Sequence, residues 1–156
     1  MDVLTIGFEG LSIPVFLSLL AAHSVDTVVD VRALPVSRKP GFSKAPLRDH
    51  LRLFGYSYLH VQELGCPKSI RDRYRQDGDR TRYRERFLRY LKQHTDAVAD
   101  LAALAKESRC ALLCFEADPD HCHRSLVAGA LRRDHNARVT HIQTTAHNHQ
   151  LQLAWR

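Results

Sequence analysis

A chain of 156 residues is long enough for one domain with a hydrophobic core. An apolar fraction of 44% with a charged fraction of 26% is ordinary globular usage, so disorder is not the default expectation. No basic region precedes an apolar stretch at the N-terminus, and no apolar run approaches the roughly 18 residues of a membrane span. We therefore expect a cytoplasmic protein without a membrane partner.

The net charge of +6 is concentrated in the segment 68–92. This segment holds ten basic and four acidic residues, an excess that equals the charge of the whole chain. Such a patch attracts phosphates or acidic surfaces, although a solvated helix face has the same composition. The candidate nucleic-acid patch consists of three arginines at helical spacing, Arg82, Arg86 and Arg89.

In chain order, the first half of the sequence predicts three strands separated by helices. A strand over 3–6 ends at Gly7, and Ser12 caps a helix that extends to about residue 22. The continuous apolar run 27–31 is typical of a buried parallel strand. The elements that follow are a basic, proline-containing loop, a short helix and a third strand, expected over 33–45, 46–54 and 56–61.

The second half continues the alternation. One or two helices are expected over 68–92, and Asp118 is expected to cap a helix that starts at Pro119 and extends to about residue 133. Another helix and the fourth and fifth strands are expected over 96–106, 110–115 and 139–142. This order predicts a single α/β domain over 1–143, a three-layer Rossmann-like fold with a mainly parallel sheet of about five strands, and a tail over 144–156.

Polar residues follow four of the predicted strands at the point where each ends. In open α/β sheets, ligands bind outside the carboxyl ends of the strands, and right-handed crossovers bring the ends of parallel strands to one edge. Gly7 follows the first strand, Asp30 and Arg32 end the second, and His60 ends the third. We expect these residues to meet the motif that follows the fourth strand.

That motif is Cys114-Phe-Glu-Ala-Asp-Pro-Asp-His-Cys-His-Arg124. Cys114 and Glu116 are two residues apart and share one side of a strand. Cys122, His123 and Arg124 fall in the first turns of the next helix, where the helix dipole favours anions and lowers the pKa of a nearby thiol.

Three interpretations of these residues remain open. In the first, Arg32 and Arg124 bind an anion in a pocket completed by Arg38 and Lys39. Catalysis would fall to Glu116 as acid or base, to a thiolate of Cys114 or Cys122, and to His60 or His123 as general base. The second is zinc, with Cys114, Cys122 and His123 as ligands and Glu116 as a fourth, although the spacing lacks a Cys-x-x-Cys knuckle. The third is structural: Arg32 pairs with Asp30 or Glu116, and each histidine bonds a backbone carbonyl.

Cys66 is followed by Arg71 five positions later, an interval similar to that of the sulfur-transfer loop of rhodaneses. Cys66 follows Leu64-Gly65 and not a long apolar strand. We therefore give the interval no weight.

Taken together, the motifs resemble the bacterial domain-of-unknown-function 488 family over residues 3–142. The ordered motifs that carry the resemblance are Thr5-Ile-Gly-Phe-Glu-Gly, Val29-Asp-Val-Arg32, Ser37-Arg-Lys-Pro-Gly-Phe-Ser-Lys44, Leu64-Gly-Cys-Pro-Lys68 and the Cys114–Arg124 motif. Phe8 stands where the family often has tyrosine. The resemblance implies a compact Rossmann-like protein without an established reaction. Its characteristic polar positions fall on Gly7, Asp30, Arg32, Cys114, Glu116, Cys122, His123 and Arg124.

The sequence thus supports three hypotheses about function. The first is an enzyme that acts on a phosphate-bearing ligand, a nucleotide or nucleic acid, at the strand edge. The alternative is a non-catalytic nucleic-acid-binding or regulatory module that uses the basic segment 68–92. The third is a metal or redox sensor built on the cysteine and histidine residues.

Overall fold

Five parallel strands form one sheet in the order β3-β2-β4-β1-β5 in the computed structural model, which describes residues 1–144. The predicted tail lies, from residue 145 onward, outside the described residues. The strands are β1 (Asp2–Gly7), β2 (Thr27–Asp30), β3 (Ser57–His60), β4 (Cys110–Cys114) and β5 (Arg138–His141). Helices flank both faces of the sheet, so the predicted three-layer Rossmann-like architecture is confirmed.

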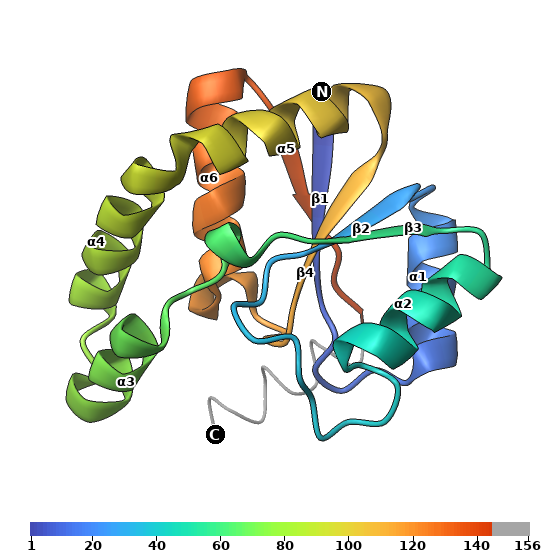
Figure 1. Cartoon of the computed structure of the whole chain (residues 1–156), viewed down its shortest axis with the longest axis horizontal. Helices are drawn as coiled ribbons and strands as arrows, with labels where there is room; N and C mark the ends of the chain where they lie inside the picture. The colour runs from blue at the N-terminus through green and yellow to red at the C-terminus, as the bar shows by residue number, and fades with distance from the viewer. Residues whose placement is uncertain (145–156) are drawn as a thin grey trace.

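The helices divide between the two faces (Figure 1). Helices α1 (Ile13–Ala22) and α2 (Lys44–Leu53) cover one face. The other face is covered by α4 (Arg80–Leu91), α5 (Thr95–Glu107) and α6 (His123–His135), and α3 (Lys68–Asp77) packs against α4. Short 3-10 turns occupy Gln62–Leu64, Lys92–His94 and Pro119–His121.

Alternation along the central strands divides the core into two layers. In β4, Leu112 packs with the α4–α6 side and Leu113 with the α1–α2 side, because successive side chains of a strand point to opposite faces. Both residues are fully buried. Burial on both faces explains why β4 has a continuous apolar sequence instead of an alternating one.

The carboxyl ends of β1, β2 and β4 form the edge of the sheet at which the chain changes direction. Gly7 at the end of β1 lies opposite Cys114 at the end of β4, and Asp30 at the end of β2 lies opposite Leu113. The connection that leaves β1 crosses one face through α1, and the connection that leaves β4 crosses the other through α6. Opposite connections from neighbouring strands open a crevice between them, the usual ligand position in such sheets.

The structure corrects the predicted start of the last helix. Pro119 begins a separate 3-10 turn, and Asp118 accepts a hydrogen bond from the backbone N–H of Asp120 within that turn. Helix α6 begins only at His123, with Cys122 as its N-cap residue. The basic segment folds as two helices, α3 and α4. Within residues 1–144, every helix is too short or too polar to cross a membrane.

Candidate functional site

A cavity of about 340 Å³ opens at the carboxyl ends of β2 and β4. One wall is the loop after β2, from Arg32 to Ser37, and another is the end of β4 with Phe115 and Glu116. Cys122 and His123 close the base at the start of α6. The α3–α4 side contributes Cys66, Arg71, Tyr74, Arg75 and Tyr83. Residues from five separate stretches of the chain therefore meet at this predicted edge.

Arg32 is a buried member of the cavity wall, with 6% of its surface exposed. Its Nε donates to Asp30 Oδ1 at 2.9 Å and its Nη2 to Oδ2 at 2.7 Å, and Tyr58 donates to the same Oδ2 at 2.6 Å. The guanidinium also lies over the ring of Phe8, 5.2 Å from its centre. The structural ion pair with Asp30 is thus present, yet Nη1 is buried and has no hydrogen-bond partner among the described residues.

Arg71 provides a second free donor in the same cavity. Its Nε is buried and has no acceptor within residues 1–144. Arg75, one turn further along α3, is exposed and also lines the cavity. Two residues of one cavity lining that each hold a buried guanidinium nitrogen without a partner among the described residues are unusual, because buried polar groups in proteins are almost always hydrogen-bonded.

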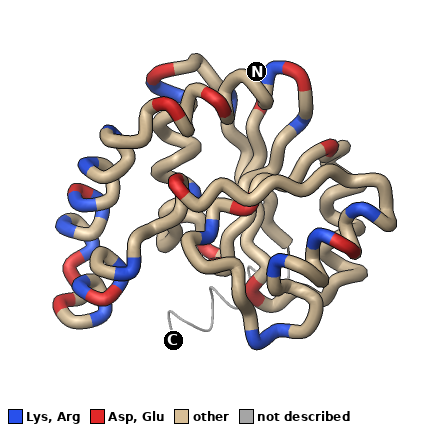
Figure 2. Tube along the Cα trace, in the orientation of Figure 1, with Lys and Arg blue, Asp and Glu red and all other residues tan. Residues whose placement is uncertain are grey.

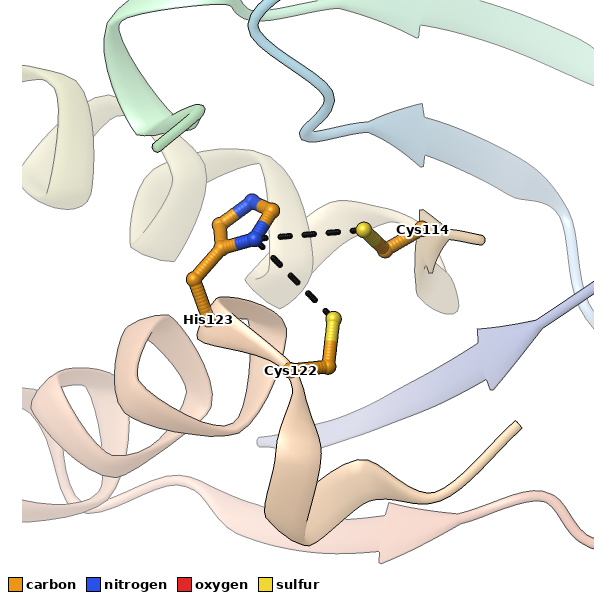
Figure 3. Close-up of side chains that lie close together, drawn as sticks. All are labelled: Cys114, Cys122 and His123. Atoms are coloured by element: carbon orange, nitrogen blue, oxygen red, sulfur yellow. Dashed lines mark hydrogen bonds between the residues drawn. The ribbon is translucent and has the colours of Figure 1, made fainter. Parts of the chain in front are cut away.

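The sulfur and imidazole groups of Cys114, Cys122 and His123 form a compact cluster at the base of the cavity (Figure 3). His123 Nδ1 lies 3.8 Å from Cys114 Sγ and 3.9 Å from Cys122 Sγ. On the other side of the ring, Nε2 donates to the carbonyl of Val31 at 2.6 Å. This bond fixes the tautomer, so that Nδ1 faces both sulfurs with its lone pair when the ring is neutral.

The pKa values of the two buried thiols are shifted in opposite directions. A hydrogen bond to Cys122, together with burial, raises the pKa of Cys114. Burial by itself would raise the pKa of Cys122, but hydrogen bonds from Cys114 and His123 bring that pKa below its ordinary value. Cys122 is also the first residue to meet the positive end of the α6 dipole. The arrangement therefore favours a thiolate on Cys122 beside a protonated Cys114.

Glu116 supplies the carboxyl group of the cavity wall. Burial, and then the nearby charges of Glu9 and Cys122, raise the pKa of Glu116 to about 7. The Glu9 carboxylate itself accepts the backbone N–H of Ala117 at 3.1 Å, which holds it close. Glu116 is thus a carboxyl group that exchanges a proton near neutral pH at the mouth of an arginine-lined cavity.

Two of the predicted site residues hold the loop that carries Glu116 and do not line the cavity. A Cβ on Gly7 would lie 1.7 Å from the carbonyl oxygen of Glu116, so only glycine permits this approach. Arg124 is fully buried, and its Nε donates to Thr5 Oγ1 at 3.2 Å. Its two other nitrogens donate to the carbonyl oxygens of Glu116 and Ala117. Each of the three guanidinium nitrogens of Arg124 is thus occupied by the scaffold.

Three further predicted residues lie outside the cavity lining. His60 donates from Nε2 to the carbonyl of Arg32 at 2.8 Å and so positions that residue. Lys39 contacts the carbonyl of Phe8 from Nζ at 3.4 Å, and Arg38 is exposed on the same loop. The structure therefore brings together Arg32, Cys114, Glu116, Cys122 and His123, with Asp30 behind them.

The candidate nucleic-acid patch lies on the α3–α4 pair, along which basic residues recur (Figure 2). Arg86 and Arg89 line a shallow groove together with Arg73 of α3. Arg82 lies outside that groove and pairs with Asp79 at 3.4 Å. Arg86 pairs with Asp77 at 3.3 Å. Neighbouring aspartates thus offset part of the positive charge of this patch.

Sequence reasoning missed the contribution of α3 and α4 to the cavity. The one available signal was the Cys66–Arg71 interval, since both residues line the cavity. Gly65 makes this possible: a Cβ there would lie 2.3 Å from the backbone nitrogen of Ala33, so the two loops touch. Burial raises the pKa of Cys66 to about 11, which keeps it a thiol and unlike Cys122.

Comparison of the sequence with known proteins gives one match, to a protein family. The family model described as Domain of unknown function DUF488 matches residues 12–131. No curated protein and no solved structure matches the sequence. The matched segment includes β2, β4 and most of α6, and it contains Arg32 and the cysteine–histidine cluster. Because this segment covers well over half of the chain, the chain belongs to the DUF488 family.

Proposed function

We propose that this protein is an enzyme that acts on a phosphate-bearing ligand, such as a nucleotide, bound in the Arg32–Arg71 cavity. One observation carries the proposal: Arg32 and Arg71 line the same cavity, and each has one buried guanidinium nitrogen, Nη1 and Nε respectively, without a partner within residues 1–144. A charged donor left unpaired in the interior costs more than about 1–3 kcal/mol, and an anionic ligand recovers that cost on binding.

Charge and shape favour phosphate over a single carboxylate. Arg32, Arg71 and Arg75 approach from two sides, and a phosphate group offers enough oxygens to accept from all three. The exposed ring of Phe115 and the ring of Tyr74 line the same cavity and suit the flat face of a base. A volume of about 340 Å³ is within the range of small-molecule sites.

A reaction, in addition to binding, is supported by the groups beside the arginines. Glu116 can accept or donate a proton at the cavity wall, and the cysteine–histidine cluster lies at the base of the cavity. A pure binding pocket needs neither group. The proposal places the protein in the cytoplasm, where thiols remain reduced.

Calorimetric titration with inorganic phosphate, a nucleoside monophosphate and acetate tests the binding half of the proposal. We expect phosphate-bearing ligands to bind and Arg71→Met to weaken them about 10- to 100-fold, because one charge-assisted bond contributes about 1.5–3 kcal/mol. Arg89→Met, which removes an exposed arginine outside the cavity, is the matched control and should bind normally. Equal binding by both variants, or preference for acetate, would refute it.

Chromatographic analysis of a nucleotide panel after incubation tests the catalytic half. Wild-type protein should convert at least one member of the panel. Glu116→Gln should bind that member with unchanged affinity and leave it unconverted. Binding without turnover by the wild type would reduce the proposal to a nucleotide-binding module.

The groove formed by Arg73, Arg86 and Arg89 favours a second candidate function, a nucleic-acid-binding or regulatory module. Three phosphate contacts predict a slope of about −2 to −3 in a plot of log affinity against log salt. Arg86→Ala with Arg89→Ala should reduce that slope by about 2. Affinity that is independent of salt and of these substitutions would exclude this function.

A further inference from the structure

We propose that Cys114, Cys122 and His123 form a zinc site, with two sulfurs and the His123 Nδ1 as ligands and a fourth position open to the cavity. Their donor atoms all lie within 4.8 Å of one another, and all three residues are buried. Two thiolates and an imidazole are soft or borderline donors of the kind that zinc prefers over magnesium or calcium.

The distances fit a tetrahedral ion. Zinc–sulfur and zinc–nitrogen bonds of about 2.3 and 2.05 Å at a tetrahedral angle separate sulfur from nitrogen by about 3.6 Å. The separations from His123 Nδ1 to Cys114 Sγ and Cys122 Sγ are 3.8 and 3.9 Å. A contraction of about 0.2–0.3 Å brings both sulfur–nitrogen separations to the tetrahedral value.

The orientation of His123 is that of a metal ligand with an outer-shell partner. Its Nε2 donates to the carbonyl of Val31 at 2.6 Å, which turns Nδ1 toward the two sulfurs (Figure 3). Ligating histidines nearly always have their other ring nitrogen bound in this way. The ring of Phe87 meets the imidazole edge-on at 5.4 Å and limits its rotation.

The scaffold fixes the ligands before any ion arrives. Cys114 ends β4, His123 begins α6, and Cys122 is the N-cap residue of that helix, so all three lie in or directly beside regular elements. The intervening loop is held by Arg124, which donates to its carbonyl oxygens, and by Gly7, which packs directly against it. Eight residues separate Cys114 from His123 in sequence, yet these contacts fix the relative position of the two ligands.

Three protein ligands and an open fourth position distinguish catalytic from structural zinc sites. The three residues line the cavity that contains Arg32 and Arg71, so the open position faces the proposed anion site. Water or an oxygen of the bound anion can complete the coordination. Coordination by the bound anion rests on the proposed function, whereas the metal site itself does not.

Cobalt substitution and metal analysis test the site on the full chain purified without a histidine tag. We expect one zinc per chain by elemental analysis. After chelation and addition of Co²⁺, tetrahedral d–d bands and thiolate-to-cobalt charge-transfer bands should appear. Cys122→Ser and His123→Gln should weaken zinc at least 100-fold in competition with a chromophoric chelator. Cys66→Ser, in the cavity lining but outside the cluster, and Cys110→Ser, at the start of β4, should retain both the bands and the affinity.

The outcomes separate this inference from the proposed function. Absence of cobalt bands in the wild type, or equal loss in the Cys66 and Cys110 controls, would overturn the metal site. A second result would also overturn it: Cys114 and Cys122 form a disulfide under mild oxidation, and the reduced protein does not bind metal. The pair would then be a redox couple. Phosphate titration of the chelated protein reports on the arginines alone, so loss of either property leaves the other measurable.

Discussion

Arg124→Met distinguishes a scaffold arginine from a ligand-binding arginine. Methionine retains much of the apolar side chain and cannot donate, so the substitution removes three hydrogen bonds, to Thr5 Oγ1 and to the carbonyls of Glu116 and Ala117. Hydrogen bonds from a charged group contribute about 1.5–3 kcal/mol each, and relief from burying the guanidinium offsets part of the sum. We expect the free energy of unfolding to fall by about 3–5 kcal/mol.

That loss is large beside the total stability of about 5–15 kcal/mol for a domain, and urea unfolding followed by circular dichroism measures it. Arg132→Met, on the exposed side of the same helix, is the control and should change stability by less than about 0.5 kcal/mol. A loss below about 1 kcal/mol for Arg124→Met, accompanied by loss of phosphate binding, would refute the scaffold role. It would restore Arg124 to the anion site that the sequence predicted.

Three further substitutions test the surroundings of the site. Gly7→Ala should destabilise the protein by several kcal/mol in thermal unfolding, since its Cβ would meet a backbone oxygen at 1.7 Å, whereas Gly129→Ala in α6 has space and should stabilise it by up to about 1 kcal/mol. Tyr58→Phe removes the hydroxyl that bonds the buried Asp30 and should cost about 1.5–3 kcal/mol in urea unfolding. Burial lowers the pKa of His141, so the contribution of this residue to the free energy of unfolding is present above pH 6.5 and is lost as the pH falls toward the lowered folded-state pKa. His141→Gln should flatten the pH dependence of the urea midpoint in that window. An unchanged profile would contradict this.

The fold was largely predictable because its central strands are buried on both faces. The segments 27–31 and 110–115 have consecutive apolar residues without alternation, a pattern that favours parallel strands between two helical layers. The start of α6 was not predictable from Pro119, because Asp118 bonds the N–H of Asp120 in a closed 3-10 turn. Capping signals identify a helical turn but do not say whether the next residues continue it.

The strand-edge rule located the candidate site but not the direction of its side chains. It brought Arg32, Glu116 and the cysteines to one edge, since these residues follow parallel strands. It also selected Arg124, whose side chain leaves the helix toward Thr5 and the loop carbonyls. Sequence spacing cannot distinguish an arginine that lines the cavity from one that bonds the scaffold, because both lie at the same strand edge. What separates them is whether a donor remains without a partner, and only tertiary packing decides that.

The basic segment and the strand-edge motif supported rival hypotheses in the sequence, yet in the structure the segment divides between them. Its first helix delivers Arg71 and Arg75 to the cavity, and its second places Arg89 in the outer groove. Density of charge therefore does not identify the arginines without partners: Arg86, in the densest part, is paired with Asp77, whereas Arg71 Nε has no acceptor within residues 1–144. The proposed small-anion site rests on that donor, and the proposal does not depend on whether the groove of Arg73, Arg86 and Arg89 binds anything.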